Sequence, residues 1–145
     1  MMTEQDKEYT LLEHMGDAYI EVYGETLKEA FQRAAIAVFD VMTDVSLIEH
    51  KLVDDICIEA NDVYTLLHDW LSTLLIRFET EMKVYSRFDV KIFKGEKIRL
   101  EAKAYGEHFN KSRHPSKTEV KAVTYHRMEV IEAPRKVTLR FILDL

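Results

Sequence analysis

Hydrophobic and polar positions follow two different periodicities along the first third of the chain. Residues 17–24 alternate one by one, which predicts a half-buried strand that ends at Gly24. Residues 26–42 carry apolar side chains at helical spacing, and they begin with Thr26 and Glu29 in a capping-box pattern. This second stretch is therefore predicted to be an amphipathic helix.

The same change from strand-like to helical periodicity occurs again in the middle of the chain. Residues 51–60 alternate and predict a strand, and Asp62 then stands where it can cap a helix. From residue 63 to residue 78 the apolar stripe is wider than half of the helix circumference. We therefore expect this second helix to be the most deeply packed element of the protein.

The remainder of the chain is mostly extended. Further strands are predicted at residues 84–92, 98–104, 120–131 and 137–143. Tyr85 falls on the polar side of the alternation, and residues 106–118, which have no periodicity, are expected to form a basic, mobile loop. Together the elements predict an α+β fold in which two helices pack on one face of a largely antiparallel sheet, an α/β sandwich.

The composition is that of one globular domain. The chain has 145 residues, 47% of them hydrophobic, and we assign residues 1–145 to a single domain. The net charge is −6 and no long run of Lys or Arg occurs, which argues against a protein that grips nucleic acid through its phosphates alone. A role in RNA metabolism would run through a protein partner.

Cysteine content and the first residues indicate an intracellular protein. Cys57 is the only cysteine, so neither an intrachain disulfide nor a zinc site of four thiolates within one chain can form. The opening MMTEQDKEYT is polar and acidic, unlike a signal peptide, and no stretch approaches about 18 uninterrupted apolar residues. We expect a cytoplasmic protein with no membrane segment.

Two carboxylates stand out because of where they lie in the predicted strands. Asp144 sits among the apolar residues of the last strand, and Asp17 stands at the start of the first. A solvated chain end would explain Asp144, and an Asx turn would explain Asp17. If the two strands pair, residues 127 positions apart meet and, with the carbonyl or terminal carboxylate of Leu145, form an oxygen-rich site that suits Ca²⁺ or Mg²⁺.

Other catalytic motifs are missing from the sequence. No HExxH, CxxC or GxxxxGKS/T string occurs, and Ser72, Ser86 and Cys57 have no neighbouring base that the sequence identifies. His126 and Lys121 are explained as ordinary residues of an extended segment. Acyl-transfer chemistry therefore has no support.

Several segments, in order and over nearly the whole chain, resemble the archease family. They are HMGDAYIEVYGETLKEAFQRAAIAVFDVMTD, LLHDWLSTLLIRFE, the SRFDV strand, the AYGE turn, HPSKTEVKAVTYH and the final FILDL. The family commonly begins this pattern with His-Thr-Ala-Asp, whereas this chain has His-Met-Gly-Asp at residues 14–17. The hydroxyl is lost, but the spacing of the carboxylate is kept.

The resemblance implies a non-catalytic protein that activates the RtcB-type RNA ligase of tRNA splicing. Such a protein cofactor promotes guanylylation of the ligase, sustains its multiple turnover and can broaden its choice of nucleoside triphosphate. The resemblance also implies a bound divalent metal, calcium above all, held by Asp17 and Asp144 with a backbone oxygen of Leu145. Lys121, in the string EVKAVTYH, becomes a candidate for partner activation.

Two other classes of function stay open. A general chaperone or modulator of nucleic-acid-processing proteins such as methyltransferases would use the surface around Tyr19, Tyr23 and Tyr85, and its client binding would survive loss of Asp17 and Asp144. A small metal-dependent hydrolase would use the same two carboxylates and would turn over a phosphoester alone.

Overall fold

The computed structural model describes residues 9–14 and 16–145. Met15 and most of the polar opening segment, residues 1–8, therefore lie outside the described residues. In chain order the elements are β1 (Tyr9–His14), β2 (Asp17–Gly24), α1 (Leu27–Met42), the 3-10 turn η2 (Val45–Leu47), β3 (Leu52–Ala60), α2 (Val63–Glu81), β4 (Lys83–Lys94), β5 (Ile98–His108), β6 (Ala122–Ala133) and β7 (Lys136–Asp144).

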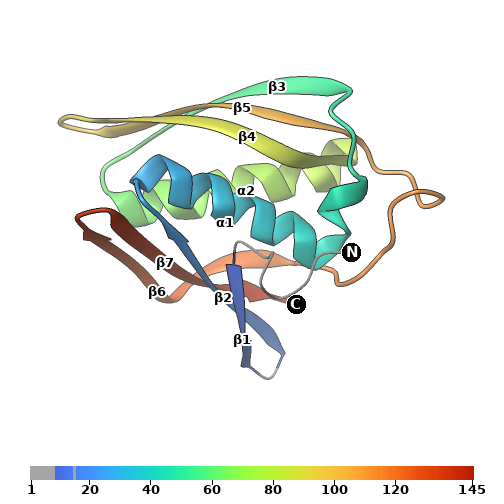
Figure 1. Ribbon diagram of the computed structural model, residues 1–145, viewed down its shortest axis with the longest axis horizontal. Coiled ribbons are helices and arrows are strands. Elements are labelled where there is room, and N and C mark those ends of the chain that lie inside the picture. The colour runs from blue at the N-terminus through green and yellow to red at the C-terminus, as the bar shows by residue number, and fades with distance from the viewer. Residues whose placement is uncertain (1–8, 15) are drawn as a thin grey trace.

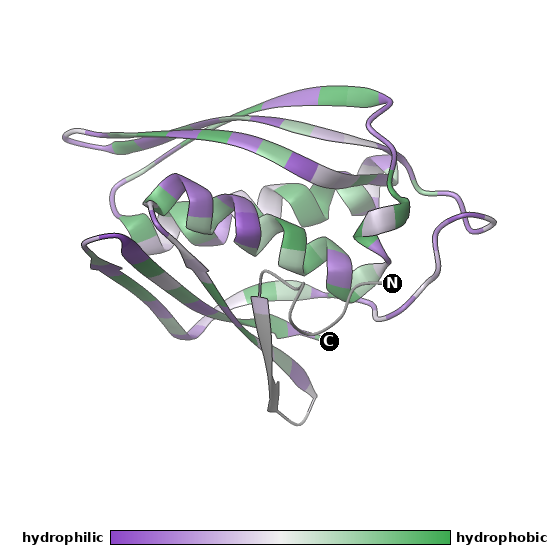
Figure 2. Ribbon diagram, in the orientation of Figure 1, coloured by the Kyte–Doolittle hydropathy of each residue, from purple (hydrophilic) through white to green (hydrophobic). Residues whose placement is uncertain are grey.

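The strands form two separate sheets, and the two long helices lie between them (Figure 1). One sheet has the order β1-β2-β7-β6 and the other β3-β5-β4, with antiparallel pairing between these neighbours. The predicted α+β class, with two helices on antiparallel strands, is confirmed; the strands divide so that the helices are covered on two sides. Figure 2 shows apolar residues along both helices and alternating hydropathy along the strands, as a layered core requires.

Both helices begin where the sequence indicates. The Thr26 hydroxyl accepts a hydrogen bond from the Glu29 N–H at 3.3 Å, and the Glu29 carboxylate accepts one from the Glu25 N–H, one residue earlier than a standard capping box. Asp62 caps α2 by accepting from the Thr65 N–H at 2.8 Å. Within the described part of the chain, no helix is long and apolar enough to cross a membrane.

The prediction that the second helix is the most deeply packed is wrong. Of the 16 residues of α1 ten are buried, whereas α2 buries six of 19. The reason is that α1 packs against β4 on one side and β2 on the other, so a single apolar stripe does not describe its buried surface. The indole N–H of Trp70 in α2 donates to the carbonyl of Phe31 in α1 at 3.0 Å and joins the two helices in the core.

A bulge in β4 overturns the expectation that Tyr85 is exposed. The register with β5 shifts between Tyr85 and Arg87, so Tyr85 faces the same side of the sheet as Phe88, and Tyr85 is fully buried with its hydroxyl donating to Asp54 at 2.6 Å. Gly106 faces this bulge, and a Cβ there would lie 1.9 Å from the Val84 carbonyl oxygen. The AYGE segment therefore lies within β5 and forms no turn.

Candidate functional site

Asp17 and Asp144 are direct cross-strand partners in the antiparallel pair of β2 and β7. Residues placed in this way project from the same face of a sheet with Cβ atoms about 4.5–5.5 Å apart. Two carboxylates at that spacing can ligate one cation. The two end strands do pair, which is the condition for this site, while the metal role of the carboxylates stays a prediction.

The carboxylate pair lies on the face of the four-stranded sheet that turns away from the helices. The next partners along the strands, Ala18 and Leu143, belong to the apolar core between the sheets. Because successive side chains point to opposite faces, Asp17 and Asp144 point outward, and both are partly exposed. We call this surface the outer face of the β1-β2-β7-β6 sheet.

All four strands of that sheet meet around the pair. His14 of β1 is the Cα partner of Asp17, and Ala122 of β6 is the partner of Asp144. The N–H of Lys121 donates to the carbonyl of Asp144 at 2.7 Å. Lys121 therefore stands directly before β6, with its side chain exposed and its backbone fixed beside the predicted site.

The segment that leads to Lys121 is held by the end of α1. The N–H groups of Lys117 and Thr118 donate to the carbonyls of Met42 and Val41 at 2.9 and 3.2 Å. The last carbonyls of a helix have no partner within the helix, so these bonds satisfy the C-terminus of α1 and fix the segment at the same time. Lys121 thus extends from a backbone with defined hydrogen bonds.

The predicted basic, mobile loop is also fixed at its other end, by a buried carboxylate. Glu107 is only 4% exposed and accepts two hydrogen bonds from Arg113 at 2.9 Å, one from the Glu49 N–H at 2.7 Å and one from His114 at 3.0 Å. His114 is fully buried, and its Nδ1 accepts the Asn110 N–H, which places the proton on Nε2. The expectation of a mobile loop is corrected, since residues that read as surface charges form a buried network.

That network determines the charge state of Glu107. Burial raises the pKa of Glu107, but the hydrogen bonds from Arg113, the Glu49 N–H and His114, together with the charge of Arg113, outweigh burial and lower the pKa to about 2. Glu107 is therefore ionised throughout the neutral range. Glu107 was not among the candidate residues expected from the sequence, although a glutamate that follows the buried alternation of residues 98–106 is a usable signal.

Asp17 and Asp144 offer the hard oxygen ligands that Ca²⁺ and Mg²⁺ prefer. Among the residues that the structure describes, no group of three or more His, Cys, Asp or Glu side chains could hold a metal ion. The fit to a divalent cation is thus that of a site with two carboxylates, supplemented by main-chain oxygen such as that of Leu145. Such ions complete their coordination with water or with oxygens of a bound phosphate.

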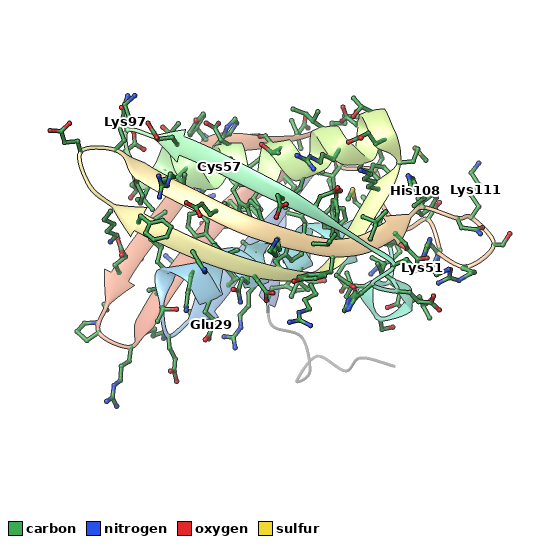
Figure 3. All side chains as sticks on the ribbon, turned by 90° about the horizontal axis from the view of Figure 1, so that it is seen from above. Glu29, Lys51, Cys57, Lys97, His108 and Lys111 are labelled. Carbon is green, nitrogen blue, oxygen red and sulfur yellow. The ribbon has the colours of Figure 1, made fainter. Side chains whose placement is uncertain are left out.

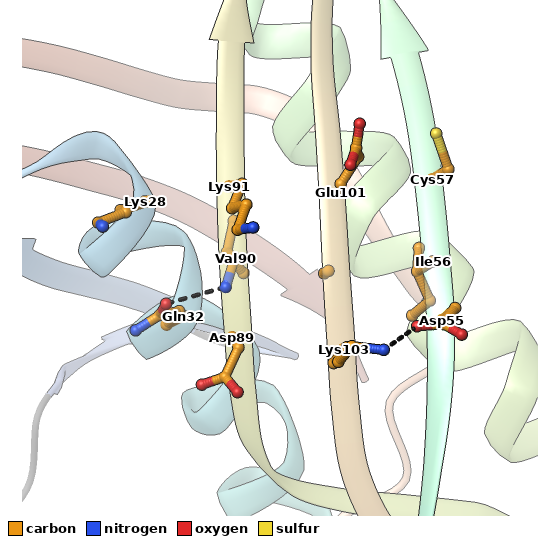
Figure 4. A pocket seen from close by; sticks show the side chains of 11 residues that line it. Lys28, Gln32, Asp55, Ile56, Cys57, Asp89, Val90, Lys91, Glu101 and Lys103 are labelled. Carbon is orange, nitrogen blue, oxygen red and sulfur yellow. Dashed lines mark hydrogen bonds and ion pairs between the residues drawn. The ribbon is translucent and has the colours of Figure 1, made fainter.

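A hollow of about 860 Å³ lies away from the carboxylate pair, on the outer side of the three-stranded sheet and beside α1 (Figure 4). Two of its charges pair across neighbouring strands: Lys103 donates to Asp55 at 2.8 Å. The Gln32 side chain accepts the Val90 N–H at 3.0 Å and so covers one group of the exposed β4 edge. Of the residues lining this hollow, Cys57 is the one thiol, and it is exposed (Figure 3).

The aromatic surface considered for a chaperone is smaller than the sequence indicates. Tyr85 is buried, the Tyr19 ring lies under the guanidinium of Arg127 at 5.2 Å, and the Tyr23 ring lies under the ammonium of Lys136 at 4.7 Å. Tyr23 is still 38% exposed. Tyr19 and Tyr23 therefore each pack against a cation, and Tyr85 does not reach the surface.

Fold and site together define a class: a small α+β protein with two helices enclosed by two antiparallel sheets and a pair of acidic residues where its first and last regions meet. A model described as the archease protein family (MTH1598/TM1083) matches residues 9–145. The chain is also 38% identical to the protein archease of Sulfurisphaera tokodaii, over 96% of this chain and 99% of that protein. The chain belongs to the archease family.

Two solved structures share this fold. The solution structure of Methanobacterium thermoautotrophicum protein 1598 has a TM-score of 0.83 and 37% identity, and the match covers 96% of this chain and 99% of that one. A Thermotoga maritima protein described as an archease and possible chaperone has a TM-score of 0.63 over 94% of this chain and 96% of its own. At 14% identity, the second structure supports the fold alone.

Proposed function

We propose that this chain is a cytoplasmic protein cofactor that activates an RtcB-type RNA ligase and has no catalytic turnover of its own. It would promote guanylylation of the ligase, sustain multiple turnover and broaden the use of nucleoside triphosphates. Membership of the archease family supports the proposal, because the resemblance implies this role. The single observation that carries it is the direct pairing of Asp17 with Asp144 on an exposed face.

The proposal includes a divalent cation, with calcium as the first candidate. Asp17, Asp144 and a main-chain oxygen of Leu145 would hold it, and when bound it would supply positive charge to phosphate oxygens of the ligase reaction. The two carboxylates would hold the cation in a defined position, because β2 and β7 are the central strands of the sheet. The residues next to the carboxylates along these strands, Ala18 and Leu143, are buried. A preorganised group loses little free energy to reorganisation during the reaction.

Lys121 is proposed as a second contact with the ligase. Its backbone is fixed by the bond to Asp144, so its ammonium group extends from a defined position beside the carboxylates. The chain's net charge of −6 repels RNA, and the proposed activator therefore acts through the ligase without strong binding to nucleic acid.

The test is guanylylation of the cognate ligase by labelled GTP, in single-turnover and multiple-turnover experiments. We expect the wild type to sustain turnover and Asp17→Ala or Asp144→Ala to lose this effect while remaining folded by circular dichroism. Asp55→Ala is the matched control, since Asp55 is an exposed strand carboxylate on the other sheet. A wild-type protein that leaves ligase turnover unchanged would refute the proposal.

The second candidate, a chaperone or modulator of nucleic-acid-processing proteins such as methyltransferases, is favoured by one observation. The related Thermotoga maritima protein is described as a possible chaperone. This function predicts protection of an aggregating methyltransferase that Asp17→Ala and Asp144→Ala retain. Tyr23→Ala would weaken the protection, because Tyr23 is the most exposed of the three tyrosines considered for client binding.

A further inference from the structure

A large bulge interrupts β6 close to the carboxylate pair. The strand leaves its register with β7 after Thr124 and resumes it at Glu129, so residues 125–128 stand opposite Phe141 alone. This is three residues more than a regular ladder holds. Since β6 is an edge strand, the extra residues have room to project, and bulges at such edges re-aim side chains.

The bulge is fixed on both sides of the sheet. Tyr125 stacks on the imidazole of His68 in α2, with ring centroids 4.2 Å apart. Arg127 has the left-handed backbone angle φ 55°, which is uncommon for a residue with a side chain, and its guanidinium lies over the Tyr19 ring at 5.2 Å. The fold therefore maintains an unfavourable backbone conformation that holds Arg127 against the outer face.

The charge of Arg127 is not neutralised within the described part of the chain. No carboxylate or hydrogen-bond acceptor there pairs with its guanidinium, whereas Arg140 on the same face binds both Glu21 and Glu129. A cation–π contact uses the flat face of the guanidinium and leaves its N–H groups at the rim. Arg127 thus presents a fork of donors to a ligand.

The residue on which Arg127 packs lies close to the carboxylate pair along β2. Tyr19, which supports the guanidinium, is two residues from Asp17 on the same strand and the same face, a distance of about 7 Å along a strand. Cations held by one or two carboxylates commonly take phosphate oxygens as further ligands, and Arg binds phosphate through two parallel hydrogen bonds. The two neighbouring groups therefore favour the same class of ligand.

We propose that Arg127 is a phosphate-binding residue that acts together with the Asp17–Asp144 pair on the outer face. The ligand is a phosphate group, of either a nucleoside triphosphate or an RNA end. The proposal rests on the proposed function for the presence of a cation at the pair. Arg127 positions the phosphate, and Tyr19 and the bulge position Arg127.

The test is a nuclear magnetic resonance titration of the full chain with inorganic phosphate, GTP and a short single-stranded RNA, each with and without calcium. We expect saturating shifts of the Arg127 side-chain N–H, tighter binding with calcium, and binding weakened about tenfold by Arg127→Gln. Arg135→Gln is the matched control, since Arg135 is exposed, has φ 59° and lies at the opposite end of the β6–β7 hairpin. Tighter binding of GTP assigns the nucleotide as the source, and tighter binding of RNA assigns the RNA end.

Two results would overturn the site: no shift at Arg127 with any probe, or equal weakening by Arg127→Gln and Arg135→Gln. Ligase activation separates this proposal from the proposed function. Arg127→Gln should raise the GTP concentration needed for half-maximal guanylylation severalfold, and Arg127→Lys should recover part of it, while Asp144→Ala abolishes the stimulation. If phosphate binds at Arg127 but the wild type does not stimulate the ligase, the function fails and the site stands.

Discussion

Glu107 and the Asp17–Asp144 pair are carboxylates in opposite environments. Glu107 is buried and accepts hydrogen bonds from Arg113, His114 and the Glu49 N–H. Asp17 and Asp144 are partly exposed and stand directly opposite each other, where like charges destabilise a sheet. A buried carboxylate that accepts several hydrogen bonds serves the fold, whereas two partly exposed carboxylates placed directly opposite each other indicate a role beyond stability.

The largest expected effect comes from removing the Glu107 carboxylate, which accepts several hydrogen bonds. Glu107→Ala should lower the free energy of unfolding by about 3–5 kcal/mol, because the donors of His114, Arg113 and the Glu49 N–H lose their acceptor, at about 1–3 kcal/mol for each buried donor. Urea unfolding at pH 7 measures this loss. Glu59→Ala, at an exposed position of β3, is the control and should change stability little. A loss below about 1 kcal/mol for Glu107→Ala would show that the network is not structural.

Acid should remove the same contribution without a mutation. The pKa of Glu107 is lowered from 4.5 to about 2 in the folded state, so folding disfavours its protonation. Its contribution to stability is therefore complete above pH 4.5 and is lost as the pH falls toward 2. Urea midpoints of the wild type and Glu107→Gln should converge across this range, and a constant difference would contradict the assigned network.

Calcium should act on the other carboxylates of this comparison, the Asp17–Asp144 pair. A ligand that binds only the folded state at 100 times its dissociation constant stabilises it by about 2.7 kcal/mol. We expect calcium to raise the melting temperature of the wild type, and Asp144→Asn to abolish the increase. Asp89→Asn, an exposed carboxylate on β4, should keep it. Equal calcium effects in both variants would place the cation elsewhere.

The smallest expected effect compares the two acids without any cation. Asp144→Asn should stabilise the protein by about 0.2–1 kcal/mol, since it removes a like charge opposite Asp17. Asp55→Asn should instead destabilise slightly, because Asp55 pairs with Lys103 on the neighbouring strand. Chemical unfolding in the presence of a chelator measures both changes, and opposite signs are the decisive outcome.

Much of the fold could be predicted from the spacing of apolar residues and from the residues that cap the helices. Alternation located β2 and β7, and the capping residues Thr26 and Asp62 located the helix starts. The meeting of Asp17 with Asp144 could be stated only on the condition that the end strands pair, which alternation does not decide. The partition into two sheets could not be predicted in this way, because alternation shows that a strand has one apolar face without showing which layer covers it.

Bulges account for most of the remaining differences. A bulge adds residues to a strand and so changes the face to which the following side chains point. The alternation of apolar and polar residues in the sequence does not reveal where such a bulge occurs. For this reason Tyr85 was expected at the surface, and the position of Arg127 over Tyr19 was not anticipated. Loop residues posed a similar problem: His114 and Arg113 look like surface cations until their distant partner Glu107 is known.

The pairing of β2 with β7 also has a consequence for the order of events during synthesis. β2 leaves the ribosome early, but β7, one of its two neighbours in the sheet, is complete only when residue 144 has been translated. Contacts between such distant segments form late and slow the folding of a chain. The acidic pair can therefore be assembled only after residue 144 has emerged, so a nascent chain that has already formed its helices cannot yet present it.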